Sequence, residues 1–279
     1  MSEEYPLVSI LIPSYNHEKY IKDSLDSILF DDYPNKEIII INDGSKDRSD
    51  ECIKEWISAN KSKVTIVYKS RENKGVCKTL NELVSLSSGK YLVPIASDDM
   101  LYPGSIKHRV NFLKAHPQKL VLVSDANVIG DNNELLMNSA IDDYNKKDKR
   151  RFKDDDGILL STLVSPQISG PSVMMDKNVF TIIGKYRENL IAEDWYFYQR
   201  AAAKKLIIFD DNIAGKYRIH TNNVSGVKVI RSIKMARTNA LTYWYNWSEM
   251  PSLKYKSIAI IELIKWSMRY MLYSLKIKT

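Results

Sequence analysis

Short apolar runs alternate with stretches of helical periodicity through the first 125 residues. The runs are rich in Val and Ile and have the length of buried strands. They lie at residues 8–13, 37–42, 64–68, 91–96 and 120–125. Helix-start signals stand between them, such as Asn16 before one helical stretch and Pro103 in the first turn of another. This alternation predicts an α/β fold with a Rossmann-like, mostly parallel sheet flanked by helices.

The end of the chain has a different pattern. From Lys256 onward, Glu262, Lys265 and Arg269 form a narrow polar stripe on an otherwise apolar and aromatic helical stretch. Such a helix can pack on the protein body, form a homodimer contact, or lie on a bilayer surface with its basic and aromatic residues near the headgroups. We therefore expect an α/β domain over residues 1–226 and a C-terminal helical extension over residues 227–279.

Composition narrows the range of partners. The 41 Lys and Arg residues outnumber the 34 Asp and Glu residues, and the net charge of +7 favours an anionic partner. The basic residues accompany no nucleic-acid-binding motif, so we expect no nucleic acid, and a phosphorylated substrate or an acidic bilayer remains. Two cysteines, no signal-peptide pattern and no run of about 18 uncharged apolar residues predict a cytoplasmic protein, with peripheral contact to the inner face of the cell membrane as an option.

Polar segments follow three of the predicted strands. They are PSYN at 13–16, NDGSKD at 42–47 and SDD at 97–99. In open parallel sheets, ligands bind outside the carboxyl ends of the strands. We expect these three segments to face one crevice.

The adjacent carboxylates of Asp98 and Asp99 repel each other unless a cation or solvent screens them. Mg²⁺ and Mn²⁺ take oxygen ligands, few of them from protein, and leave room for substrate phosphates. An exposed turn is the alternative explanation for such a pair. The neighbouring strand ends favour the metal site.

Asp43 ends the second strand, and its carboxylate can accept a hydrogen bond from a nucleobase N–H. The ring of Tyr15 is available for stacking, and Gly44 permits a turn with positive φ. A turn or helix-capping aspartate is the alternative for Asp43.

Glu193 and Asp194 precede an aromatic helical stretch, where a carboxylate can act as the general base for a hydroxyl nucleophile. Stabilisation by the helix dipole is the alternative for both carboxylates. Trp195 can provide a platform for a sugar or belong to the core.

Seven segments occur in an order and spacing that resemble the family 2 glycosyltransferases of GT-A fold. They are PSYNHEKYIKDSLDSIL, EIIIINDGSKDRS, NKGVCKTLN, GKYLVPIASDDMLYP, ISGPSVM, AEDW and YRIHTNNVS, and together they cover roughly residues 7–226. The resemblance implies an inverting, metal-dependent enzyme that uses Mn²⁺ or Mg²⁺ and a UDP-sugar.

The resemblance and the residue patterns described above together assign roles to individual residues. Asp194 is the expected catalytic base. The expected nucleotide-sugar-binding residues are Pro13, Tyr15, Asn16, Asp43, Asn73, Gly75, Asp98 and Arg218. The expected metal ligands are Asp98, Asp99 and His220. The expected acceptor-binding residues are Gly170, Pro171, Glu193 and Trp195.

By this resemblance the chain is a hexosyl- or N-acetylhexosaminyltransferase. Its acceptor is a hydroxyl of a glycan or of a polyprenyl-diphosphate-linked glycan, in the synthesis of capsule, O-antigen or exopolysaccharide. Two positions depart from the family pattern: Ala96 stands where an acidic residue is usual, and Leu80 stands where an arginine is common. A noncatalytic scaffold of the same fold that binds carbohydrate or nucleotide is therefore the alternative.

Overall fold

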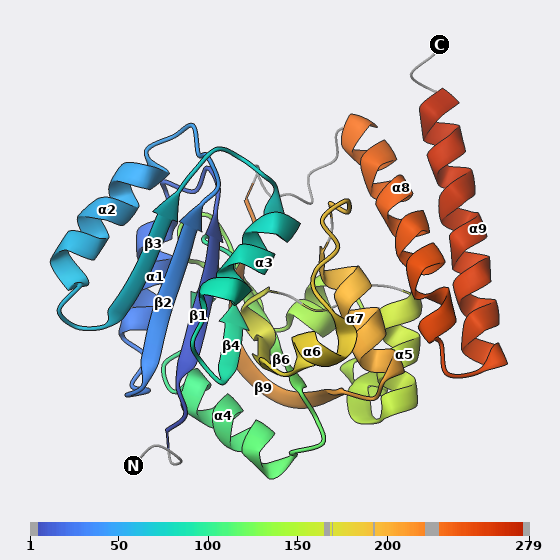
Figure 1. Ribbon diagram of the computed structural model, residues 1–279, viewed down its shortest axis with the longest axis horizontal. Helices are drawn as coiled ribbons and strands as arrows, with labels where there is room; N and C mark the ends of the chain where they lie inside the picture. The colour runs from blue at the N-terminus through green and yellow to red at the C-terminus, as the bar shows by residue number, and fades with distance from the viewer. Residues whose placement is uncertain (1–4, 165–167, 169, 192, 221–228, 276–279) are drawn as a thin grey trace.

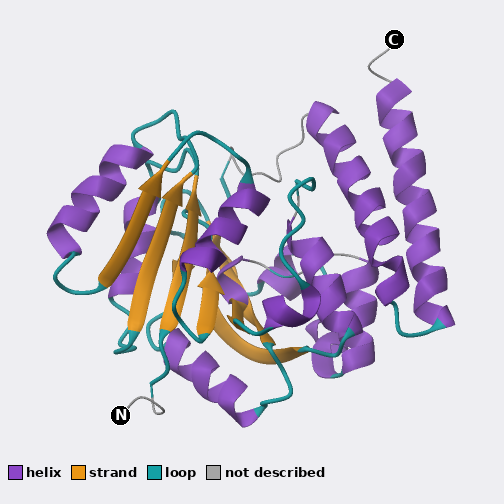
Figure 2. Ribbon diagram, viewed as in Figure 1, coloured by secondary structure: helices purple, strands orange, loops and turns teal. Residues whose placement is uncertain are grey.

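The computed structural model describes residues 5–164, 168, 170–191, 193–220 and 229–275, with only the backbone for 193 and 229–231. A curled sheet forms the body of the molecule, with helices on both faces and a helical pair at the C-terminal end (Figures 1 and 2). The predicted α/β architecture and C-terminal helical extension are confirmed. The predicted domain boundary at 226–227 lies outside the described residues.

The first part of the chain alternates strands and helices as the apolar pattern predicts. Its elements are β1 (Val8–Ser14), α1 (Ile21–Leu29), β2 (Lys36–Asn42), α2 (Ser49–Asn60), β3 (Thr65–Ser70), α3 (Val76–Leu86) and β4 (Tyr91–Pro94). β1 pairs in parallel with β2 and β4, and β2 pairs in parallel with β3. Because helices cover both faces, the run Ile38–Ile41 is apolar throughout and completely buried.

The second part mixes strand directions. Its strands are β5 (Met100–Leu101), β6 (Val121–Ile129), β7 (Leu135–Met137), β8 (Val173–Asp176) and β9 (Ile207–Arg218). The sheet order is β3-β2-β1-β4-β8-β6-β9-β5, with β7 on β6. β8 runs antiparallel to both β4 and β6, whereas β6 and β9 are parallel. The sheet is therefore mixed beyond β4. Apolar periodicity did not predict these directions, because strand direction depends on the long connections between strands.

Helices complete two apolar layers. One contains α1, α2 and α4 (Ser105–Ala115), and the other contains α3, α5 (Asp155–Val164), α6 (Val179–Ile183) and α7 (Glu193–Ala203). Short helical turns are η1 (Ala140–Tyr144), η2 (Lys149–Lys153), η3 (Gly170–Ser172) and η4 (Trp247–Glu249). Alternate β2 residues serve opposite layers, since Ile38 belongs to the first and Ile39 to the second.

The C-terminal pair consists of α8 (Val229–Asn246) and α9 (Leu253–Leu275), which lie side by side (Figure 1). Tyr255 and Ala259 of α9 are buried, and Trp266 packs edge-to-face on Trp195 with 5.8 Å between ring centroids. This packing ties α9 to the α/β body. Within the described ranges, no helix is both long enough and apolar enough to cross a membrane.

Candidate active site

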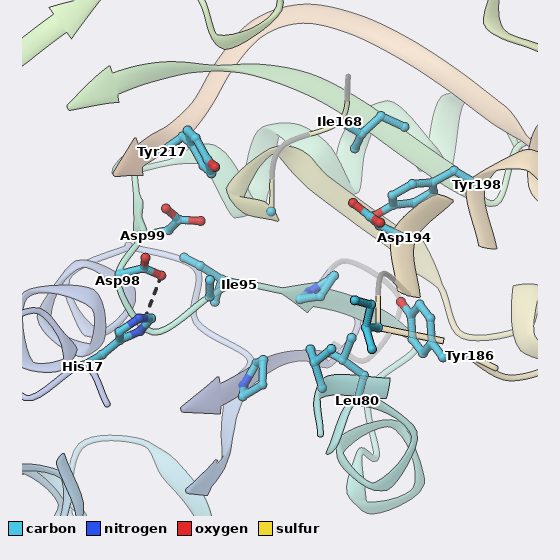
Figure 3. Close-up of a pocket in the computed structure, with 16 residues that line it drawn as sticks. His17, Leu80, Ile95, Asp98, Asp99, Ile168, Tyr186, Asp194, Tyr198 and Tyr217 are labelled. Atoms are coloured by element: carbon cyan, nitrogen blue, oxygen red, sulfur yellow. Dashed lines mark ion pairs between the residues drawn. The ribbon is translucent and has the colours of Figure 1, made fainter. Parts of the chain in front are cut away.

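A cavity of about 340 Å³ opens beside the ends of β1 and β4. Its polar lining includes His17, Asp98, Asp99 and Asp194. Figure 3 shows His17 and Asp98 at one end of the cavity and Asp194 beside Tyr198 at the other. The structure thus brings the predicted carboxylates of Asp98, Asp99 and Asp194 to one cavity.

Asp98 lies between two histidines that come from distant parts of the chain. Its Oδ2 atom is 3.0 Å from His220 Nε2, and its Oδ1 atom is 3.6 Å from His17 Nδ1. One ligand atom from each residue lies within 4.8 Å of the other two. Burial lowers the pKa of His17 against the opposing effect of the Asp98 charge, so the neutral imidazole that a metal needs is favoured.

This donor set fits a divalent metal ion. Two imidazoles and one carboxylate suit Mn²⁺ and other first-row ions, whereas Mg²⁺ prefers oxygen ligands. His17 was not among the predicted ligands. Its position directly after PSYN, a strand end expected to face the crevice, is the signal that could have identified it.

Asp99 is more deeply buried than Asp98 and faces a different partner. Its Oδ1 accepts a hydrogen bond of 2.9 Å from the backbone N–H of Arg218. A Cβ at Gly170 would lie 3.2 Å from Asp99 Oδ2, so the predicted acceptor-side loop passes close to this carboxylate. Burial, together with the Asp98 charge, holds the pKa of Asp99 well above its usual range.

Asp194 lies in the first turn of α7 and lines the cavity. Its Oδ1 accepts a hydrogen bond of 2.7 Å from the backbone N–H of Trp195, which fixes the carboxylate. Burial raises the pKa of Asp194 above its usual value. A carboxylate of this kind holds a proton more tightly than an exposed aspartate does.

Asp43 organises the loop that follows β3. Its carboxylate accepts hydrogen bonds of 2.9 Å from the backbone N–H groups of Lys74 and Gly75, and it forms an ion pair with Arg71. The Asn73 side chain donates to the Asp43 carbonyl at 2.8 Å. The predicted nucleotide-binding residues Asp43, Asn73 and Gly75 therefore meet in one loop. Arg71 was not predicted, and no motif in the sequence singled it out.

Gly44 occupies a backbone position that leaves no room for a side chain. Its φ is +74°, and an added Cβ would lie 2.6 Å from the Asn73 nitrogen. We expect Gly44→Ala to lower the free energy of unfolding by about 1–3 kcal/mol through backbone strain and this contact. Urea denaturation measures the effect.

Gly184 provides the matched control, since its φ is +79° and an added Cβ would meet no neighbouring atom within 4 Å. Gly184→Ala therefore tests positive φ alone. Equal losses in the two variants would contradict the role of the close approach to Asn73.

Other predicted nucleotide-sugar residues have mixed placements. Pro13 lines the cavity, whereas Tyr15 is exposed and Asn16 Oδ1 accepts a hydrogen bond of 2.7 Å from the backbone N–H of Lys46 on a neighbouring loop.

Arg218 is completely buried, and its guanidinium donates to the Asp98 carbonyl at 2.8 Å and to the Gly130 carbonyl at 2.8 Å. Arg218 thus braces the backbone at Asp98, and its predicted contact with the donor stays a prediction.

The predicted acceptor residues are also separated. Gly170 lines the cavity, and Pro171 is buried behind it. Trp195 is buried in the core, and its indole N–H donates to the Thr162 carbonyl at 2.6 Å. The Glu193 side chain lies outside the described residues. Packing accounts for Trp195, while its contact with an acceptor stays a prediction.

The two departures from the family pattern face the same space. Ala96 and Leu80 both line the cavity. The positions expected to carry an acid and an arginine therefore contribute apolar surface. His17 lies at the Asp98 end of this cavity and belongs to the cluster that could hold a metal ion.

Comparisons with known proteins identify the family of this chain. The model of the family described as glycosyl transferase family 2 matches residues 9–180. An uncharacterised glycosyltransferase of Rickettsia prowazekii is 32% identical over 216 residues, which are 77% of this chain and 64% of that relative. An uncharacterised glycosyltransferase of Haemophilus influenzae is 27% identical over 274 residues, 94% of this chain and 81% of that relative. The chain thus spans less than two thirds of the length of the Rickettsia relative.

Two solved structures share the fold. The Staphylococcus aureus protein TarS in complex with UDP-GlcNAc has a TM-score of 0.69 and 18% identity, and the match covers 94% of this chain and 72% of that one. The mannosyltransferase PcManGT of Pyrobaculum calidifontis in complex with GDP-Man and Mn²⁺ has a TM-score of 0.67 and 14% identity, covering 97% and 73%. These similarities confirm the GT-A fold, and with the family match over β1 to β8 this chain belongs to glycosyl transferase family 2.

Proposed function

We propose that this chain transfers a sugar from a UDP-sugar to an acceptor hydroxyl, with inversion at the anomeric carbon. One observation carries the proposal: the His17, Asp98 and His220 cluster and the Asp194 carboxylate line or border the same cavity. Charge develops on the leaving diphosphate and on the attacking hydroxyl during such a transfer. The His17, Asp98 and His220 end of the cavity would therefore serve the leaving diphosphate, and the Asp194 end would serve the attacking hydroxyl.

The nucleoside would lie near the loop that Asp43 organises. Asp43, Asn73 and Gly75 form one hydrogen-bonded unit, which holds the loop in a fixed shape. A preorganised loop reduces the conformational cost of binding. TarS was solved with UDP and with UDP-GlcNAc, which supports uridine as the base.

His17, Asp98 and His220 would hold a divalent ion, and the two imidazoles favour Mn²⁺ over Mg²⁺. When bound, the ion supplies Lewis-acid stabilisation of negative charge on the diphosphate. Asp99 lies beside this set and keeps the Arg218 backbone in place through its hydrogen bond. We retain Asp99 as a proposed ligand of the site.

Asp194 would take the proton from the acceptor hydroxyl as the hydroxyl oxygen attacks the anomeric carbon. The backbone N–H of Trp195 holds the carboxylate in place for that transfer. The bond to the diphosphate breaks on the opposite face, and the proton remains on Asp194. A single displacement of this kind inverts the anomeric configuration.

We further propose a hexosyl or N-acetylhexosaminyl donor, and a glycan or polyprenyl-diphosphate-linked glycan as acceptor, in polysaccharide synthesis at the inner face of the cell membrane. Gly170, next to Asp99, would border the acceptor. Pro171, Glu193 and Trp195 complete the proposed acceptor set.

Calorimetric titration with UDP and with GDP, each in Mn²⁺, Mg²⁺ or EDTA, tests the donor site. We expect UDP to bind more tightly than GDP, and more tightly in Mn²⁺ than in EDTA. A preference for GDP would contradict the uridine assignment. GDP is the nucleotide of the donor in the PcManGT complex, so it is the relevant competitor. Binding that is identical in Mn²⁺ and EDTA would contradict the metal site.

A noncatalytic scaffold is the second candidate, and Ala96 and Leu80 in the cavity wall favour it. A scaffold would bind the nucleotide but release no UDP from UDP-sugars in the presence of glycan acceptors. Measured UDP release from a panel of UDP-sugars distinguishes it from the enzyme.

A further inference from the structure

The outer face of α9 carries a continuous apolar stripe. Its residues are between 41% and 61% exposed, and they are Ile260, Ile261, Ile264, Met268, Met271, Leu272 and Leu275. At 100° per residue they fall within an arc of roughly 120° that extends over four turns. We call this set the α9 stripe. Contiguous apolar surface of this kind marks an interaction site more often than scattered exposed residues do.

The opposite face of α9 fixes the direction of the stripe. Tyr255 and Ala259 are buried, and Trp266 contacts Trp195 of α7. Figure 1 shows α9 at the outer edge of the molecule, with α8 on its inner side. The stripe therefore points away from the body because the other face of the helix is already packed.

The charged residues beside the stripe are almost all basic. Lys254, Lys265 and Arg269 lie along one side of it, and Lys256 lies on the other. The single acidic residue in α9, Glu262, lies next to Lys265 and Arg269 on the same side of the helix and forms an ion pair with Lys265. Two exposed tryptophans, Trp244 and Trp247, belong to the adjoining α8 and η4. An apolar arc with a cationic border and exposed tryptophans is the composition of a helix that lies in a membrane interface.

We propose that the α9 stripe docks on the surface of an anionic lipid bilayer, with the helix axis parallel to the membrane plane. Anionic headgroups complement the Lys and Arg border, and the acyl region accepts the Ile, Leu and Met side chains. A second copy of this chain fits less well, because packing two stripes together would bring two mainly basic borders together, and the one acidic residue that each copy contributes is already paired with Lys265. The inference does not depend on the donor or on the reaction.

Sedimentation of the full chain with lipid vesicles tests the proposal. We expect binding to vesicles that contain phosphatidylglycerol and much weaker binding to pure phosphatidylcholine. Ile264→Ser combined with Met268→Ser should reduce partitioning at least roughly tenfold, because two exposed apolar side chains lose their burial in the bilayer. Both positions are more than 50% exposed, so the free protein should keep its melting temperature.

Leu135→Ser combined with Leu136→Ser is the matched control, since both residues are exposed apolar side chains on β7, away from α9. This control should bind vesicles like the unmodified chain. The proposal is overturned if the unmodified chain does not bind anionic vesicles, or if the α9 variant binds them as tightly as the unmodified chain does. A dimer in analytical ultracentrifugation that the same α9 variant disperses would also overturn it, by assigning the stripe to a second copy.

Discussion

Replacing Asp194 with asparagine should reduce sugar transfer roughly 10²- to 10⁴-fold, the range by which a positioned general base accelerates a reaction. The amide has nearly the same shape and keeps an oxygen that can accept from the Trp195 N–H, which is 2.7 Å from Asp194 Oδ1. It cannot take a proton from the acceptor hydroxyl. Donor affinity should therefore stay the same while the turnover number falls, and initial rates of UDP release together with calorimetry of UDP binding separate the two.

The pH profile gives an independent signature of the same base. Burial raises the pKa of Asp194, and the base works only when it is deprotonated. Activity should fall as the pH drops through this raised pKa, so the acidic limb should lie above the range of an ordinary aspartate. Asp194→Asn should remove that limb from any residual activity.

Asp156→Asn is a suitable control, because Asp156 is an exposed aspartate in the first turn of α5. It should leave both rate and pH profile unchanged. Normal turnover in Asp194→Asn would exclude Asp194 as the base and direct attention to another carboxylate at the cavity.

Replacing Asp98 with asparagine should weaken Mn²⁺ binding roughly 100-fold or more, since even groups that only orient a metal ligand change affinity 10- to 100-fold. Asp98 is the carboxylate between His17 and His220, so its loss removes both a ligand and the charge that balances the cation. UDP binding in Mn²⁺ should then fall to its level in EDTA. Titration of the Mn²⁺ electron paramagnetic resonance signal measures the metal directly, and calorimetry measures the nucleotide.

A second histidine–aspartate pair provides the control. His108 Nε2 lies 2.6 Å from Asp210 Oδ2, outside the cavity. Asp210→Asn should leave Mn²⁺ affinity unchanged, and His17→Asn should reduce it as Asp98→Asn does, although less. Unchanged Mn²⁺ binding in Asp98→Asn would exclude this cluster as the metal site.

The parallel half of the fold could be predicted because its signal is local. The run Ile38–Ile41 is apolar at every position, which indicates a strand buried on both faces, and the structure buries it completely. The direction of β8 could not be predicted. Met174 and Met175 have the same apolar character in either direction, and only their pairing with β6 and β4 decides it.

In the candidate site, too, features with a local sequence signal could be predicted and features that depend on distant partners could not. Three polar strand ends, at 13–16, 42–47 and 97–99, were expected to face one crevice. The first and the third contribute residues to the cavity, whereas none of the cavity-lining residues comes from 42–47. The roles of Asp43 and Arg218 depend on partners distant in sequence, since Asp43 binds the 71–75 loop and Arg218 holds the Asp98 carbonyl. For Trp195, residue type alone could not separate two roles, because an aromatic side chain suits a sugar platform and a buried core equally well.

The proposed metal cluster joins three segments that are far apart in the chain. His17 follows β1, Asp98 follows β4, and His220 follows β9, 122 positions beyond Asp98. In the unfolded chain these three side chains are far apart. His220 joins the cluster only when β9 pairs with β6. A ligand that binds this cluster therefore selects molecules whose two halves have assembled, and its binding energy adds to the stability of the whole sheet. In the cell, the supply of metal and sugar nucleotide would then influence how long this protein survives proteolysis as well as how fast it works.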